Sequence, residues 1–156
     1  MSSSSSISFV FPGACAHYFL GTVKEYSLNV MSNRYEPGEI TLSCGSGTVS
    51  MIKYRYGDDL AIIIAPAGAS SVTLTFSRFD TDAEKETAAE VYVSECRDRS
   101  CNHGTRLLEA TSGNTVPASI TSSTGILLVQ FYVWTDSSHS GTISPHRGWL
   151  GTWTSL

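Results

Sequence analysis

An acidic segment in the middle of the sequence gathers the residue types that bind cations. Residues 80–90, within "FSRFDTDAEKETAAEVYVSEC", carry five carboxylates: Asp80, Asp82, Glu84, Glu86 and Glu90. Carboxylate oxygens are the ligands that Ca²⁺ prefers, but acidic side chains on a loop between strands are usually solvated or paired with Lys or Arg. The segment therefore predicts either a cation site or an ordinary solvated loop. Which of the two applies depends on what the flanking elements bring close to it.

Catalytic chemistry is not expected from this sequence. It contains four histidines and many serines but no Gly-x-Ser-x-Gly turn that would expose a nucleophile. Asp136, Ser138 and His139 lie together in "DSSHSGT", where such residues more often form turn hydrogen bonds. Phosphate-binding loops, dinucleotide fingerprints and His-Glu-x-x-His motifs are also missing from the sequence. We therefore predict that the protein is not an enzyme.

The three tryptophans offer a second kind of site. Trp134, Trp149 and Trp153 could form a platform on which a sugar stacks. Trp149 and Trp153, however, follow a strand pattern at the end of the chain, where packing in the core is the more common use.

Length and composition limit the classes of protein that the chain can belong to. Its 156 residues suit one domain, and 41% hydrophobic with 15% charged residues indicates a folded globular chain. The net charge of −4 provides no basic stripe for phosphates, so a nucleic-acid partner is not expected. No apolar run reaches the roughly 18 to 20 residues that span a bilayer, so membrane insertion is not expected either.

Alternation of apolar and polar residues recurs along the chain and predicts strands. It is clearest in "SVTLTFS", where Val72, Leu74 and Phe76 alternate with hydroxyl side chains. Only "DAEKETAAE" has helical propensity, and it is long enough for a turn or two at most. We predict an all-β, antiparallel β-sandwich or jelly roll. Its other expected strands are "EITLSC", "SMIKYRYG", "LAIIIAP", "EVYVSEC", "TRLLEATSG" and "TGILLVQFYVWT", with a glycine turn at "CGSGT".

Four cysteines form an even set that is typical of disulfides. Cys96 and Cys101 are close enough in sequence to bridge across a turn, which leaves Cys15 and Cys44 as the second pair. Free thiols and a zinc site are the alternatives, but the spacing has no matching second half for zinc. Disulfides would place the protein in an oxidising, extracellular setting.

Residues 1–39 differ in texture from residues 40–156 and are interpreted as an N-terminal arm. The arm contains the apolar stretch "ISFVFPGACAHYFLGTVKEYSLNV". It could add edge strands to its own sandwich or pack on a neighbour's sheet by strand addition. "Ala14-Cys15-Ala16" mimics a signal cleavage site, but the segment lacks a positively charged start, so we do not expect a cleaved signal peptide.

From about residue 40 onward, the order of short motifs resembles a CUB domain, an extracellular β-sandwich module. "CGSGTVS" is similar to the Cys-Gly-Gly opening, and "IIIAPAGASSVTLTFSRFDTD" resembles the stretch that ends in Phe-x-x-Phe-Asp-x-Glu. "GILLVQFYVWTD" is similar to the family's later apolar strand with its Ser-Asp, and "GWLGTW" corresponds to the closing Gly-Phe-x-Ala-Tyr. The cysteines depart from the family pattern, so the resemblance implies no disulfide pairing.

The resemblance also implies a calcium site. Many CUB domains bind calcium through three carboxylates, which match Asp82, Glu90 and Asp136 here. Two of the three exchange Asp and Glu relative to the family, and calcium tolerates either carboxylate. Asp80, Glu84 and Glu86 are then expected to be solvated.

These features lead to three functional hypotheses, one of which is a glycan lectin that binds without metal. The first is an extracellular or cell-surface CUB-like module that recognises a protein or glycan ligand, with calcium ordering its binding loops. The alternative is a structural subunit of an extracellular filament, coat or particle that self-associates through its N-terminal arm.

Overall fold

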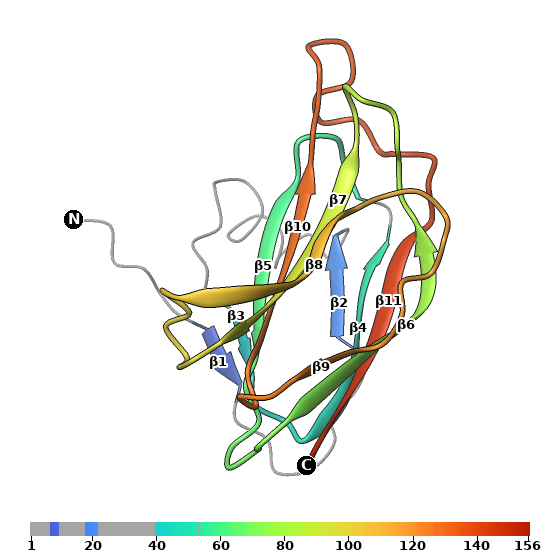
Figure 1. Cartoon of the computed structure of the whole chain (residues 1–156). Helices are drawn as coiled ribbons and strands as arrows, with labels where there is room; N and C mark the ends of the chain where they lie inside the picture. Colours follow the sequence, from blue (N-terminus) through green and yellow to red (C-terminus); the bar gives the residue numbers. More distant parts are fainter. Residues whose placement is uncertain (1–6, 10–17, 22–39, 53) are drawn as a thin grey trace, which may run out of the picture.

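Two facing β-sheets make up the part of the chain that the computed structural model describes, namely residues 7–9, 18–21, 40–52 and 54–156 (Figure 1). One sheet has six strands in the order β1-β3-β5-β10-β7-β8, and the other has five in the order β2-β4-β11-β6-β9. The strands are β1 (Ile7–Phe9), β2 (Tyr18–Gly21), β3 (Ile40–Leu42), β4 (Ser46–Ile52), β5 (Asp59–Ile64), β6 (Val72–Asp80), β7 (Ala89–Cys96), β8 (Gly104–Thr111), β9 (Ile120–Ser122), β10 (Leu127–Val133) and β11 (Gly148–Ser155).

The core fills the space between the sheets, because each strand turns alternate side chains inward. In β6, Val72, Leu74 and Phe76 are buried as their alternation predicts. Trp149 and Trp153 of β11 are fully buried, and the Trp153 indole Nε1 donates to the Cys44 carbonyl at 3.0 Å. The predicted all-β sandwich is confirmed, and these two tryptophans belong to the core.

The pairing of the first strands differs from a purely antiparallel sandwich. β3 lies parallel to β1 and β5, and β2 lies parallel to β4. The glycine segment after β3 does not form a hairpin turn, because the chain passes there from the six-stranded sheet to the five-stranded sheet. β3 and β4 therefore lie in different sheets. The segment with helical propensity forms a turn, closed by a bond from the Thr87 amide to the Glu84 carbonyl.

Parts of the predicted N-terminal arm join the sandwich. β1 and β2 add to the edges next to β3 and β4, as expected for an arm that extends its own sheets. The rest of the arm, including the region of the cleavage-site mimic and Cys15, lies outside the described residues, and packing of the arm on a neighbour's sheet stays a prediction. Among the described residues there is no helix that could cross a membrane.

The cysteines behave as structural cross-links. Cys96 and Cys101 form a disulfide at the start of the connection between β7 and β8. Cys44 is disulfide-bonded as well, and its predicted partner Cys15 is outside the described residues.

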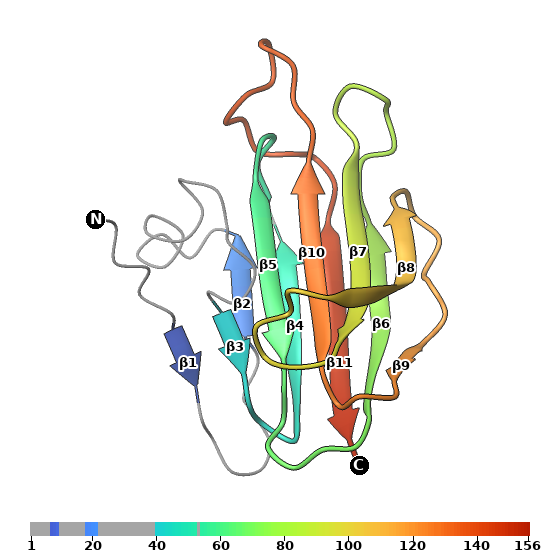
Figure 2. The same ribbon diagram turned by 60° about the vertical axis from the view of Figure 1, so that its left-hand side comes forward.

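Three loops gather at one end of the sandwich, at the top of Figures 1 and 2: residues 54–58, 81–88 and 134–147. Backbone hydrogen bonds tie them together, including Tyr56 N to Thr142 O at 3.0 Å and Trp134 N to Ala88 O at 2.9 Å. We call this region the loop end.

β8 departs from the plane of its sheet. Its register with β7 shifts between Val91 and Val93 and again between Val93 and Ser94. Figure 2 shows the strand turning across the outer face of the six-stranded sheet rather than lying flat beside β7. β8 therefore stands above the outer face of the six-stranded sheet and borders part of that face.

Candidate functional site

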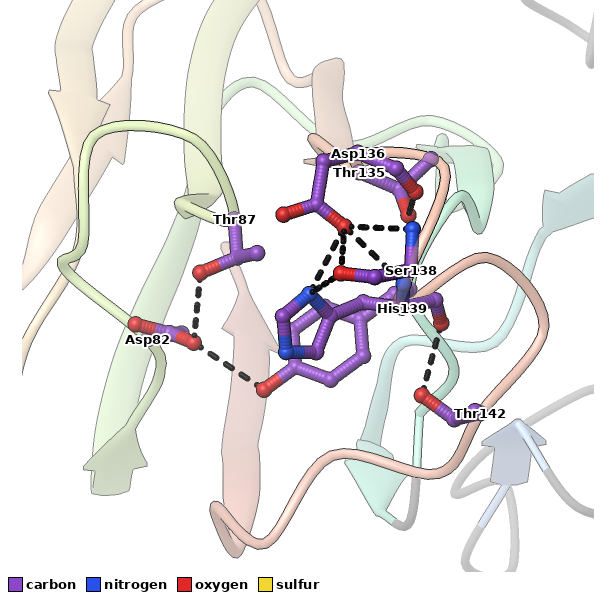
Figure 3. Close-up of polar contacts among 8 residues, drawn as sticks. Asp82, Thr87, Thr135, Asp136, Ser138, His139 and Thr142 are labelled. Atoms are coloured by element: carbon purple, nitrogen blue, oxygen red, sulfur yellow. Dashed lines mark hydrogen bonds and ion pairs between the residues drawn. The ribbon is translucent and has the colours of Figure 1, made fainter.

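Asp82 is the centre of a hydrogen-bond network at the loop end (Figure 3). Asp82 is 6% exposed and lies two residues beyond the end of β6. Oδ2 accepts bonds from the Tyr56 hydroxyl and the Thr87 hydroxyl, each at 3.0 Å, and Oδ1 accepts from the Glu84 amide at 2.9 Å. Burial raises the pKa of Asp82, but these three hydrogen bonds outweigh it and hold the pKa below its ordinary value.

Tyr54 supports the same turn from the other side. Its hydroxyl oxygen accepts a bond from the Asp82 amide at 3.0 Å, and burial raises the pKa of Tyr54 to about 12. The two tyrosines of "KYRYG" therefore hold the backbone and the side chain of Asp82. This pair was missed at the sequence level, because the loop that carries it is distant in the chain.

Asp136 organises a turn of its own in the loop before β11. Its Oδ1 accepts from the Ser138 amide and hydroxyl at 2.9 and 2.7 Å, and it lies 2.7 Å from His139 Nδ1. These bonds, with the Ser138 hydroxyl first and His139 second, lower the pKa of Asp136 to about 2. The Ser138 hydroxyl is 3.0 Å from the same Nδ1. A hydrolytic triad needs serine and carboxylate on opposite ring nitrogens, so this trio has turn geometry instead.

The two aspartates lie on different sides of His139 (Figure 3). The Tyr56 hydroxyl donates to Asp82, and the Tyr56 ring packs edge-on against the His139 ring, with 5.3 Å between the two ring centroids. The contact between the Tyr56 and His139 rings therefore links the hydrogen-bond network of Asp82 to that of Asp136. The Asp136 carboxylate is hydrogen-bonded within its own loop, whereas the Asp82 carboxylate is bonded both within its own loop and to Tyr56 of another.

Asp80, expected to be solvated, connects two elements instead. Its Oδ1 lies 2.9 Å from His146 Nδ1, and its Oδ2 accepts from the Arg147 amide at 2.8 Å. The His146 side-chain contact, followed by the Arg147 amide, lowers the pKa of Asp80. Glu84 and Glu86 are exposed, as predicted.

Glu90 points to a different surface from Asp82 and Asp136. In β7, Ala89, Val91 and Val93 are buried in the sandwich, so the pleat turns Glu90 to the outer face of the sheet. Its Oε2 accepts from the Tyr92 hydroxyl at 2.6 Å and from the Trp134 indole at 3.1 Å. Across the described residues, no group of three or more His, Cys, Asp or Glu side chains is placed to hold a metal ion.

The outer face of the six-stranded sheet carries a hollow of about 260 Å³. Two cross-strand rows build it: Ala61, Gln130 and Tyr92 in one, and Asp59, Tyr132 and Glu90 in the next. Ala61 lies 3% exposed among larger neighbours, so its short side chain leaves the space open. We call this the outer-face hollow; its lining residues are Asp59, Ala61, Tyr92, Arg106, Gln130 and Tyr132.

Charges of both signs line the outer-face hollow. Arg106 comes from the crossing strand β8, and its guanidinium carbon lies 4.7 Å from the centre of the Tyr92 ring. The hydrogen bond to Glu90, followed by burial, raises the pKa of Tyr92 to about 12. Burial raises the pKa of Asp59 on the opposite side. The hollow therefore combines aromatic surface with a fixed cation and a partly desolvated carboxylate.

Replacing Glu90 with glutamine tests this arrangement. We expect the pKa of Tyr92 to fall from about 12 towards the ordinary value of 10, because the negative acceptor beside its hydroxyl is lost. NMR of the tyrosine rings across alkaline pH measures it, and Glu86→Gln, an exposed loop change, serves as the control. An unchanged Tyr92 pKa in Glu90→Gln would show that the two side chains are not bonded.

Two other surfaces are less suited to a ligand. A polar hollow of about 510 Å³ borders the disulfide, but Glu95 there already accepts bonds from the amide and hydroxyl of Ser123. On the other sheet, threonines and serines of neighbouring strands bond one another, as Thr73 does with Thr121 at 2.9 Å. The outer-face hollow is thus the best-formed candidate among the described residues.

Solved structures of CUB domains resemble this fold. The crystal structure of the MASP-1 CUB2 domain bound to Ca²⁺ matches with a TM-score of 0.55 and 16% identity, covering 74% of this chain and 96% of that one. The CUB1-EGF-CUB2 domains of human MASP-1/3 match with a TM-score of 0.55 and 17% identity, covering 79% of this chain and 44% of that one.

A third solved structure, of a much longer chain, also contains this fold. The full extracellular region of zebrafish Gpr126/Adgrg6 matches with a TM-score of 0.51 and 15% identity, covering 75% of this chain and 14% of that one. No protein-family model and no curated protein matches the sequence. Together with the two-sheet architecture, the structural matches show that this chain folds as a CUB-like β-sandwich.

Proposed function

We propose that the domain is an extracellular recognition module that binds a protein or glycan ligand on the outer face of its six-stranded sheet. The observation that carries this proposal is the outer-face hollow, which the exposed Tyr132 and the half-buried Tyr92 line together with charged and amide groups. Ligand sites in proteins combine apolar and aromatic walls with a few placed polar groups in this way. No catalytic step is part of the proposal.

Two observations support the extracellular setting. The Cys96–Cys101 disulfide suits an oxidising compartment. One structural neighbour is the extracellular region of zebrafish Gpr126/Adgrg6.

The calcium hypothesis stays a prediction, although this structure does not bring its three carboxylates together. Glu90 is on the outer face of the sheet, and both Asp82 oxygens already accept bonds from protein donors. The calcium in the MASP-1 CUB2 structure belongs to that protein.

EDTA is therefore expected to leave the melting temperature of the purified domain unchanged, and added CaCl₂ is expected not to raise it. Differential scanning calorimetry measures this in buffer free of competing metals. A calcium-dependent rise that is lost in Asp82→Asn would contradict the expectation. It would show that the loop end rearranges to place Asp82 on the ion.

The binding proposal is tested by probing arrays of immobilised glycans and of secreted proteins with the wild-type domain and with Tyr132→Ala. We expect binding to at least one array, with loss of signal in the variant, because Tyr132 lies at the centre of the hollow's second row. Val116→Ala truncates an exposed apolar side chain that belongs to neither row and does not line the hollow, and it is the control. Binding that Tyr132→Ala leaves intact would rule out this face as the site.

A further inference from the structure

We propose that the outer-face hollow binds one ring of a saccharide, with the sugar stacked on Tyr132 and its hydroxyls bonded to Asp59, Gln130 and Arg106. This inference rests on the proposed function and names its ligand class. It is argued from the groups that line the hollow, from their burial and from the size of the space.

The hydrogen-bonding inventory of the lining calls for a ligand that both donates and accepts. Asp59 as a carboxylate only accepts, Arg106 only donates, and Gln130 does both. A ligand with several neighbouring hydroxyls can serve all three groups at once, since each hydroxyl is a donor and an acceptor. A purely cationic or purely anionic group would leave part of the lining without a partner.

The aromatic groups supply the apolar half of the site. Tyr132 is 38% exposed and Trp134 is 48% exposed, and their rings meet edge to face with centroids 4.9 Å apart. The C–H face of a sugar ring packs on such an exposed aromatic surface. Glu90 accepts from the Trp134 indole and from the Tyr92 hydroxyl, so these two aromatic side chains are held in place before a ligand arrives.

The charge distribution argues against the main competing ligand, a lysine or arginine side chain of a protein. Arg106 already places a positive charge over Tyr92, at 4.7 Å from the ring centre. A second cation in the same hollow would be repelled by it, and Glu90 already accepts two hydrogen bonds. A neutral, hydroxyl-rich ring meets neither obstacle.

The size of the hollow limits how much of a glycan it holds. Its volume of about 260 Å³ lies just below the range of pockets that enclose drug-sized ligands, roughly 300 to 1,000 Å³. We therefore expect one ring to enter and the adjoining rings to lie along the sheet surface.

The proposal is tested by titrating the isotopically labelled domain with a panel of neutral monosaccharides and short oligosaccharides and following the backbone amides by NMR. We expect shifts at Ala61, Tyr92 and Gln130, and none along the outer face of the other sheet at Thr73. In the same titration Tyr132→Ala should weaken binding at least about tenfold. Val116→Ala should bind as the wild type does.

Ala61→Val gives a second variant that does not touch the aromatic rings. Valine suits a strand, and its extra methyl groups would fill the floor of the hollow. We expect it to abolish saccharide binding while its NMR spectrum stays that of a folded domain. Thr75→Val, on the exposed face of the other sheet, is the matched control and should bind normally.

The outcomes separate the two proposals. Saccharide binding that neither Tyr132→Ala nor Ala61→Val reduces would overturn the assignment to this hollow. If no saccharide binds but a secreted protein does, and Tyr132→Ala abolishes that binding, the saccharide inference falls while the recognition function stands. Failure of both ligand classes would overturn the recognition function as well.

Discussion

Replacing Asp82 with alanine is expected to lower the free energy of unfolding by about 3 kcal/mol or more. The substitution removes a buried carboxylate that accepts hydrogen bonds from two hydroxyls and one amide. It leaves the buried Thr87 hydroxyl and the Tyr56 hydroxyl without this acceptor. Hydrogen bonds to charged groups contribute roughly 1.5 to 3 kcal/mol each, and donors left unpaired in the interior add a further cost.

Urea unfolding of both proteins measures this difference, provided that the slope of the transition is unchanged. Glu86→Ala removes an exposed carboxylate from the same loop and should change stability by no more than about 0.5 kcal/mol. A loss of less than about 1 kcal/mol in Asp82→Ala would mean that the network does not hold the loop end together.

The pH dependence of this effect follows from the depressed pKa of Asp82. A carboxyl group whose pKa is lower in the folded than in the unfolded state stabilises the fold above its unfolded pKa, about 3.9 for aspartate. That contribution is lost as the pH falls through the folded pKa. The stability difference between wild type and Asp82→Ala should therefore be full near neutral pH and shrink in acid below about pH 4.

Gly125→Ala is expected to cost about 3 kcal/mol, through backbone geometry rather than through lost contacts. Gly125 lies in the turn before β10 with a φ of +78°, in the left-handed region that disfavours side chains. A Cβ atom there would also overlap the Ala69 carbonyl oxygen of the turn between β5 and β6. Neither backbone can move away easily, since each closes a connection between strands of the two sheets.

Gly68→Ala separates the two contributions. Gly68 has a φ of +71°, but a Cβ there would have no atom within 4 Å. It should therefore show the conformational cost alone, about 1 to 2 kcal/mol. Thermal or urea unfolding compares the variants, and equal losses at the two glycines would contradict the close approach of the two turns.

The strands could be predicted from the sequence wherever alternation is long. "SVTLTFS" shows its buried face directly, and it became most of β6. β9, with three residues, is too short for a periodic signal and was missed. The parallel pairing of β3 with β5 could not be predicted either, because which strands become neighbours depends on contacts distant in sequence.

The residues of the candidate site could likewise be predicted only in part from the sequence. Asp82 was singled out through the family resemblance, and the structure gives it a buried, bonded position. Glu90 could have been assigned to the outer face from "AEVYV" itself, because the alternation that buries Val91 and Val93 turns the intervening residues outward. The partners of Asp82 could not be found this way, since Tyr56 reaches it from a different loop. Local patterns predict which face a residue occupies but not which loop it meets.

The pleat of β10 has a consequence for how such a module can diversify. Gln130 and Tyr132 face the hollow, while Val129, Phe131 and Val133 alternate with them and fill the core. Substitutions at every second position can therefore change the chemistry of the outer face while the neighbouring residues keep the core intact. One short strand thus carries two separate sets of constraints, one from the core and one from the outer face.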